Sequence, residues 1–302
     1  MARATEQKRI PRRSMFSTVL RAVLTVLCLE VLLLVGTLYF SNVTGQLDQN
    51  AVDILEKQIE NRQNYLQSTL LSAQDLDALG SRINTAAAGL LAAGDISLDT
   101  LDRSSADALP LLEAVSGDLI SALRQRSVTG VFVVLNTHDL DSLSAPVNLP
   151  CVYLRDLDPT TAPSARNFDI SMEVCPAELV QSLHISTDTC WTPALTYDPA
   201  DPAAFLYPPF QAAFTGGAQL TAAGYGHWTT APYTLAGDEA HPAAAYSIPL
   251  MLPDGTVYGV VGIELLESHL RALLPFGELL SDGSGAYVLA VADAPEGNGV
   301  LS

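Results

Sequence analysis

The hydrophobic pattern starts with one uninterrupted apolar segment near the N-terminus. Residues 22–40 read AVLTVLCLEVLLLVGTLYF, with a single charge at Glu30 and no proline. At about 1.5 Å per residue, a helix of this length spans about 28 Å, close to the hydrocarbon core of a bilayer at about 30 Å. The segment therefore predicts a transmembrane helix in contact with lipid, in which Glu30 either faces a partner helix or is protonated.

Basic residues before this segment predict its orientation. Six of the 15 Lys and Arg residues lie in residues 1–21, beside one acid, Glu6. Because basic flanks stay on the cytoplasmic side, we expect residues 1–21 in the cytoplasm and the chain from residue 41 outside. The alternative is a cleaved secretory signal, whose apolar region is only about 7–15 residues long and ends in small residues. The bulky end of this segment, TLYFSN, favours an uncleaved anchor.

The region 41–126 carries apolar residues at helical spacing. The stripe occupies positions 47, 51, 55, 59, 66, 70, 73, 76, 79, 83, 87 and 90. This period predicts one long helix, or two joined near Gly80, followed by a second helical segment over 107–126. The stripe is narrow in its first half, which predicts either the seam of a homodimer or a stalk that lies along a domain. After Tyr65, packing of the helix on the core of its own domain is the alternative.

Beyond residue 127 the pattern changes to short β-branched and aromatic runs. Strands are predicted at 131–136, 149–155, 226–231, 243–252, 256–265 and 286–293. Asp254-Gly255 predicts a hairpin turn, and short helices are expected near Pro176, near Pro202 and over 266–275. Together these elements predict an α+β fold, a mostly antiparallel PAS-like sheet over 127–293 with long helices on one face and a tail at 294–302.

Charge and residue spacing exclude several functions. After the apolar segment, nine basic residues face 31 of the 33 acids, so nucleic-acid binding through phosphates is not expected. Cys151, Cys175 and Cys190 allow at most one intramolecular disulfide. The sequence has no Cys/His spacing for zinc, no phosphate-binding glycine loop and no catalytic constellation. We therefore expect a protein that is not an enzyme, without metal or cofactor.

Two segments, HWTTAPY (227–233) and AYSIPLMLPDGTVYGVVGIELLESHLRALLP (245–275), carry a family resemblance. They resemble the core of the extracellular Cache sensor domains of bacterial chemoreceptors, sensor histidine kinases and diguanylate cyclases. The shared features are a Trp-bearing strand, a Tyr-bearing strand, a glycine-turn hairpin and a short helix. The resemblance implies a sensor that binds an amino acid, an amine or a carboxylate and signals through the stalk helix and the span. Double-Cache ectodomains of the family continue into a second, membrane-proximal sheet and a second span, so the resemblance implies a fragment or a truncated gene product.

The resemblance also implies the residues that contact the ligand. Trp228 and Tyr246 match positions that face ligand in the family, and Tyr233 and His227 add an aromatic and a polar group beside them. The alternative for each is a half-buried packing residue. For the whole chain, the alternative is an anchored extracellular binding or structural module of the cell envelope that has no signalling role.

Overall fold

A computed structural model describes residues 15–40, 43–164, 166–274, 291–292 and 300–301. The chain divides into two units, Met1–Asn61 and Arg62–Ser302. The first unit contains helix α1, Met15–Phe40, which confirms the predicted apolar helix and begins before it. By length and composition α1 is able to cross a membrane, and none of its residues is buried.

Three helices follow α1 in the sequence, and a side chain caps the start of the third. They are α2, Val43–Gln74; α3, Asp77–Ala93; and α4, Ser105–Gln125. The break after α2 falls at Asp75 and Leu76, and not near Gly80, which lies inside α3 against the side chain of Ile248. The Ser104 hydroxyl caps α4 by accepting a hydrogen bond from the backbone N–H of Asp107.

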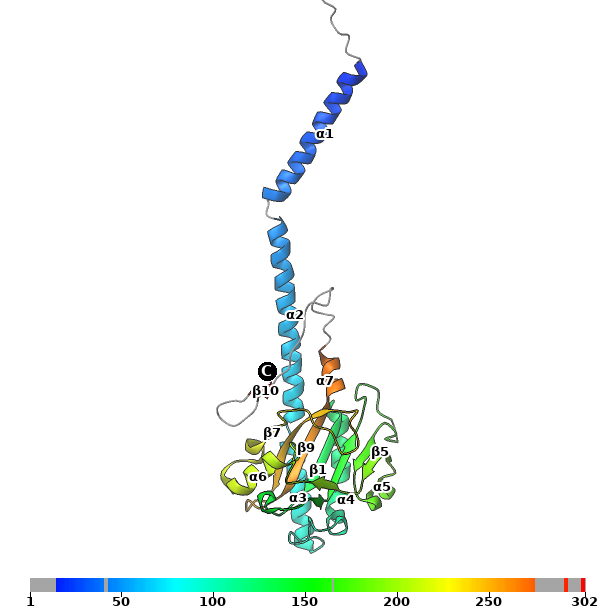
Figure 1. Ribbon diagram of the computed structural model, residues 1–302, viewed down its shortest axis with the longest axis vertical. Coiled ribbons are helices and arrows are strands. Elements are labelled where there is room, and N and C mark those ends of the chain that lie inside the picture. Colours follow the sequence, from blue (N-terminus) through cyan, green and yellow to red (C-terminus); the bar gives the residue numbers. More distant parts are fainter. Residues whose placement is uncertain (1–14, 41–42, 165, 275–290, 293–299, 302) are drawn as a thin grey trace, which may run out of the picture. The chain divides into compact units, whose positions relative to one another are not determined.

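A seven-stranded sheet forms the centre of the second unit (Figure 1). Its order is β5 (Ser186–Thr192), β4 (Ser171–Val174), β3 (Cys151–Arg155), β1 (Gly130–Leu135), β9 (Val257–Leu266), β8 (Ala243–Met251) and β7 (His227–Trp228). All neighbours are antiparallel except β4 and β5. The predicted α+β class with a mostly antiparallel sheet is therefore confirmed. The β8–β9 hairpin turns at the predicted Asp254-Gly255, where Gly255 has a φ of 88° that favours glycine.

Smaller elements fill the connections of the second unit. They are β2 (Val147–Leu149), β6 (Leu195–Tyr197), α5 (Ala177–Leu183), α6 (Tyr207–Gly216), α7 (Glu267–Leu273) and the 3₁₀ turns η1 (Leu140–Ser142), η2 (Gly217–Gln219) and η3 (Ala222–Tyr225). Strand β2 pairs with β6 in a separate two-stranded sheet. The helices α5 and α7 confirm the predictions, whereas α6 begins at Tyr207 and not at Pro202, because its prolines occupy the first turn.

Two predictions about the strands need correction. The strand predicted at 286–293 is described only at β10, Val291–Ala292, and its other residues lie outside the described ranges. Strand β10 pairs with β11, Val300–Leu301, and not with the seven-stranded sheet. Strands β4 and β5 fall in a region for which only short helices were predicted, because β4 is short and β5 reads STDTCWT, which lacks an apolar alternation.

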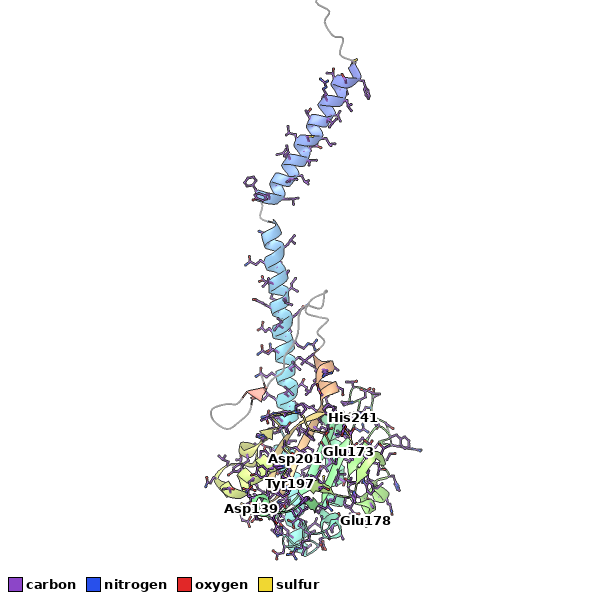
Figure 2. The ribbon with its side chains drawn as sticks, viewed as in Figure 1. Asp139, Glu173, Glu178, Tyr197, Asp201 and His241 are labelled. Atoms are coloured by element: carbon purple, nitrogen blue, oxygen red, sulfur yellow. The ribbon has the colours of Figure 1, made fainter. Side chains whose placement is uncertain are left out.

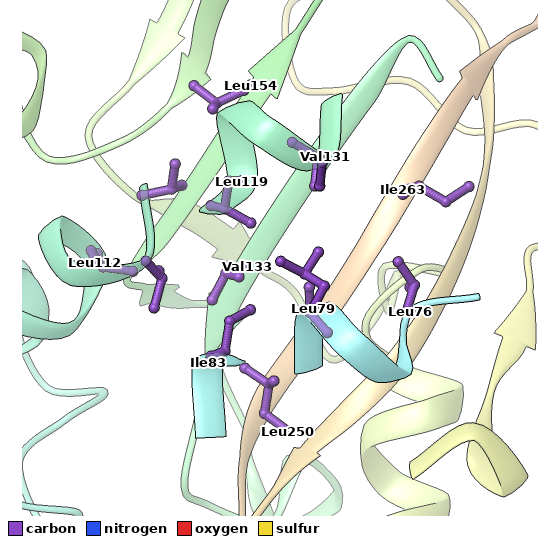
Figure 3. Close-up of a cluster of buried hydrophobic side chains, with 14 of the residues drawn as sticks. Leu76, Leu79, Ile83, Leu112, Leu119, Val131, Val133, Leu154, Leu250 and Ile263 are labelled. Atoms are coloured by element: carbon purple, nitrogen blue, oxygen red, sulfur yellow. The ribbon is translucent and has the colours of Figure 1, made fainter. Parts of the chain in front are cut away.

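The sheet separates two hydrophobic clusters. On one face, α3 and α4 pack against the strands in a largely apolar core that includes Leu79, Ile83 and Leu119 (Figure 3). On the other face, the loops between β6 and β8 and helix α6 cover a second cluster that includes Phe132, Tyr153 and Phe205. We call these the helix-covered face and the loop-covered face.

Candidate functional site

A cavity of about 670 Å³ lies on the loop-covered face of the sheet. Its walls come from β4 and β5, from the segment 195–205 that contains β6 and the loop after it, and from the loop 231–238. This volume is within the range of about 300–1,000 Å³ that is typical of small-molecule sites. The sheet edge and two irregular segments therefore form a hollow of the size that a small ligand needs.

The lining combines apolar walls with a few acidic groups. Leu195, Phe205 and Leu235 are buried apolar residues, and Tyr233 is a half-buried aromatic residue whose ring packs on that of Phe205 at 4.8 Å between centroids. The acidic lining residues are Glu173, Asp198, Asp201 and Asp238. Figure 2 labels Glu173 and Asp201, which come from β4 and from the loop after β6. This mixture is typical of ligand pockets.

A buried arginine organises the acidic groups beside the cavity. Arg155, at the end of β3, is 1% exposed, and its Nε and Nη2 atoms donate to the two carboxylate oxygens of Glu264 at 2.8 and 2.7 Å. Its Nη1 atom donates to Asp238 Oδ2 at 2.5 Å and lies 3.5 Å from Glu173 Oε2. Bidentate geometry with an ionised partner gives a strong hydrogen-bonded pair. Three carboxylates thus share one guanidinium group.

The sheet register explains how this cluster fits on the strand surface. Gly130 on β1 pairs with Arg155 on one side and with Glu264 on the other. A Cβ atom at Gly130 would lie 2.8 Å from Glu264 Oε1, so the missing side chain leaves room for the ion pair. Gly262 similarly leaves room for the Phe132 ring, which a Cβ atom would approach at 2.3 Å. Two glycines in apolar strands therefore create the polar and aromatic surface of this face.

Two tyrosine hydroxyls connect the ion pair to the cavity. Tyr153 Oη donates to Glu264 Oε2 at 2.6 Å and lies 2.6 Å from Tyr233 Oη. Burial raises the pKa of both phenols well above the ordinary value, so both stay protonated at neutral pH. Tyr233 is in turn a lining residue, so a change at the cavity wall reaches the Arg155 cluster through two hydrogen bonds.

The carboxylates of the cluster differ in their affinity for protons. Burial raises the pKa of Glu173, and the Ser171 hydroxyl and the Arg155 charge oppose this only in part. Burial also acts to raise the pKa of Asp238, but hydrogen bonds from His241 and Arg155 outweigh it and lower the pKa. For Arg155, the hydrogen bonds and charge of Glu264 outweigh burial and raise the pKa, which keeps the guanidinium charged. Of Glu173 and Asp238, Glu173 is thus the carboxylate that takes a proton more readily.

The structure does not bring the four sequence-predicted residues together. Tyr233 lines the cavity. Trp228 and Tyr246 pack on each other at 5.3 Å between ring centroids, belong to the core of the helix-covered face and are only 3% and 4% exposed. His227 is half-buried on β7, is absent from the lining, and has its pKa lowered by burial. The role of Trp228, Tyr246 and His227 as ligand contacts stays a prediction.

Sequence reasoning missed the charged residues of the site, although a signal was present. Arg155 ends the apolar strand CVYLR, Glu173 lies in SMEV and Glu264 lies in the strand VYGVVGIELL. A charge inside a buried strand is costly unless it is paired, so three such strands indicate a shared ion cluster. The three cysteines after α1 are free thiols, and no group of metal-ligating side chains occurs in the part of the chain that the structure describes.

Comparisons with known proteins add little to this picture. No family model and no curated protein matches the sequence. Among solved structures, the chain is similar to "Methyl-accepting Chemotaxis protein X" at 15% identity and a TM-score of 0.31, over 77% of this chain and 68% of that one. It is also similar to the extracellular domain of a protein assigned as the histidine kinase soHK1S-Z6, at 15% identity and a TM-score of 0.27, over 72% of this chain and 65% of that one. At these values neither likeness transfers a function.

Proposed function

We propose that this chain is a membrane-anchored sensor domain that binds a small molecule outside the cell in the cavity on the loop-covered face. The single observation that carries the proposal is the cavity itself, with its aromatic wall and its buried Arg155 cluster. Buried ion pairs contribute little net stability to a fold. A module with a purely structural role would therefore gain little from buried charges beside a cavity of ligand size. The Cache-like sequence segments supply the expectation of a receptor.

The membrane part of the proposal rests on α1 and the basic residues before it. We expect residues 22–40 to contact lipid and residues 1–21 to lie in the cytoplasm. A single cysteine introduced at the exposed Ser97, with Cys28 and Cys190 replaced by serine, should react with an impermeant thiol reagent on intact cells. Labelling that appears only after lysis would show that the orientation is the opposite of the one proposed here.

Transmission of a signal requires contact between the sheet and α2. Trp228 Nε1 on β7 donates to Gln74 Oε1 at 3.4 Å, in the last turn of α2. Arg126, just after α4, donates to the carbonyl oxygens of Ser72 and Ala73 at 3.2 and 3.4 Å and also to that of Asp75. The end of α2 is therefore tied to both the sheet and α4. We propose that a ligand with different affinity for two arrangements of the sheet moves α2 through these contacts.

Assembly is a further part of this proposal. The α2 residues Leu47 and Ile59 are large, apolar and exposed, and we propose that they lie in the seam of a homodimer. Replacing Leu55 and Ile59 by Glu should give monomers in detergent, because like charges would face each other across the seam. A native chain that sediments as a monomer at micromolar concentration would rule the seam out.

A thermal-shift screen of the full chain in detergent tests ligand binding. Amino acids, amines and carboxylates are added one at a time, and a ligand that binds the folded state raises the melting temperature by mass action. Ala236 lines the cavity and Ala200 does not, and both are exposed. Ala236→Trp should remove the shift of a true ligand, whereas Ala200→Trp should keep it. If no compound gives a shift that depends on Ala236, the alternative of an anchored structural module is favoured.

A further inference from the structure

The charged side chains that line the cavity are all negative. Glu173, Asp198, Asp201 and Asp238 line it, and none of its described lining residues is Lys, Arg or His. The acids come from separate segments, β4, the loop after β6 and the loop before β8, so they surround the hollow from more than one side. A hollow lined by one sign of charge concentrates ligands of the opposite sign.

The guanidinium group of Arg155, beside the cavity, already contacts three carboxylates. Arg155 Nε and Nη2 donate to Glu264, and Nη1 donates to Asp238 and approaches Glu173. Arg155 is 1% exposed and does not itself line the cavity. A ligand carboxylate would therefore have to displace a buried carboxylate from Arg155, or lie beside the acidic lining, where His241 is already hydrogen-bonded to Asp238 Oδ1 at 2.7 Å. Both are costly, so the site discriminates against anionic groups.

Glu173 has capacity for another hydrogen-bond donor. It is 4% exposed and belongs to the cavity lining. Its one short side-chain hydrogen bond comes from Ser171 Oγ to Oε1 at 2.7 Å, while Arg155 Nη1 lies at the longer distance of 3.5 Å from Oε2. An ionised carboxylate offers about four acceptor sites, so Glu173 is left with lone pairs at the cavity wall. An ammonium group, which has three donors and no acceptor, complements it.

We propose that the cavity binds an organic cation that has no carboxylate of its own. The ammonium group lies against Glu173 and Asp238. The carbon chain packs on one side against the rings of Phe205 and Tyr233. On its other side it packs against the loop that carries Asp198 and Asp201. Aromatic faces add a cation–π attraction to the charge attraction. The inference rests on the proposed ligand-binding function and narrows it to one class of ligand.

Three probes of equal chain length test this inference by calorimetric titration of the full chain in detergent. Putrescine carries an ammonium group at both ends, 4-aminobutanoate carries one ammonium and one carboxylate, and succinate carries two carboxylates. Putrescine should bind at least about tenfold more tightly than 4-aminobutanoate, and succinate should not bind. If putrescine fails to bind at about 1 mM, or if either other probe binds as tightly, the cation class is wrong.

Paired variants connect the binding to the cavity. Glu173→Gln removes one charge without changing shape and should weaken putrescine binding about tenfold. Asp201→Asn, at an exposed position of the lining, should weaken putrescine binding less than Glu173→Gln does. If Glu173→Gln does not fold, Asp201→Asn tests whether the acidic lining binds the cation. Glu178, an exposed residue of α5, lies outside the lining (Figure 2). Glu178→Gln makes the same charge change and should leave the affinity for putrescine unchanged. Equal affinity for putrescine in all three variants overturns the inference.

The same titrations separate this inference from the proposed function. If succinate binds and Ala236→Trp prevents it, the cavity is a ligand site for anions and only the cation class fails. If Ala236→Trp leaves the binding of every probe and every screened compound unchanged, the proposed function of the cavity fails as well.

Discussion

The two faces of the central sheet use the same strands for opposite purposes. Val152 and Leu154 of strand β3 lie in the core of the helix-covered face, and Tyr153 and Arg155 of the same strand lie on the loop-covered face. Because side chains alternate along a strand, one short sequence serves both surfaces. The helix-covered face is dominated by a large hydrophobic core, whereas the loop-covered face carries buried charges beside the ligand-sized cavity.

This difference separates stability from binding. Burial of apolar surface stabilises the helix-covered face at about 25 cal/mol per Å². Buried ion pairs contribute little net stability, because desolvation offsets their attraction. The Arg155 cluster is therefore explained better by the cavity beside it than by a need to hold the fold together. We therefore expect substitutions on the helix-covered face to change stability, and substitutions at the cavity to change binding.

The largest effect is expected at Arg155. Arg155→Met leaves Glu264, Asp238 and Glu173 without their shared cation, which should lower the free energy of unfolding by about 3–5 kcal/mol. Arg82 is the control, because its Nε donates to Asp118 Oδ1 at 2.7 Å while the two side chains are 49% and 34% exposed. Arg82→Met should cost about 1 kcal/mol or less. Urea denaturation of both variants measures the difference, and equal losses would contradict a special cost of the buried cluster.

Trp228→Ala tests the helix-covered face. Trp228 is buried against Tyr246 in the apolar core, so its removal should cost about 3–5 kcal/mol of unfolding free energy. The affinity of the folded variant for putrescine should not change. Phe214→Ala, at an aromatic residue that is 39% exposed, is the control and should cost about 1 kcal/mol or less. Loss of binding with little loss of stability would instead make Trp228 the ligand contact that the sequence predicted.

Acidification should weaken cation binding on the loop-covered face. The pKa of Glu173 is raised by burial above its ordinary value of 4.5, so a falling pH protonates it while Asp238, whose pKa is lowered, remains ionised. The Kd of putrescine should rise by up to about tenfold per pH unit in this window. Glu173→Gln should flatten the profile. A native profile as flat as that of the variant would remove Glu173 from the site.

The smallest effect is expected at the partly exposed ion pair of Arg124 and Asp169. Hydrogen bonds from Arg124 lower the pKa of Asp169 from 3.8 to about 2. A lowered folded-state pKa means that the unfolded chain binds the proton more tightly, so this stability is present above pH 3.8 and is lost as the pH falls toward about 2. Because Asp169 is partly exposed, the change should be about 1 kcal/mol. Urea denaturation between about pH 5 and about pH 2 measures it, and Asp169→Asn should remove it.

The hydrophobic pattern predicted the helix-covered face well. The stripe through positions 79, 83 and 87 indicated which side of α3 packs inward, and all three residues are buried in the core. The strands β1, β8 and β9 were also predicted, because their apolar runs are rich in β-branched and aromatic residues and an Asp-Gly turn joins the last two. The end of α2 was missed, since the stripe continues through the break at Leu76.

Sequence patterns predicted little of the loop-covered face. Strand β5 is too polar to show an alternation, and the loops 198–206 and 229–242 are placed by contacts with distant strands. Arg155, Asp238 and Glu264 are far apart in the sequence, and only the register through Gly130 brings the first and last together. Trp228 and Tyr246 were chosen by resemblance, and periodicity alone does not show which face of a strand is the core.

Hydrogen exchange of the full chain with and without putrescine tests most directly which face binds the ligand. Binding in the cavity should slow the exchange of backbone amides in the segments 198–206 and 231–238 and leave α3 and β7 unchanged. The Ala236→Trp variant should show no protection by putrescine. Protection confined to α3 and to Trp228 on β7, with the cavity segments unchanged, would instead place the ligand on the helix-covered face.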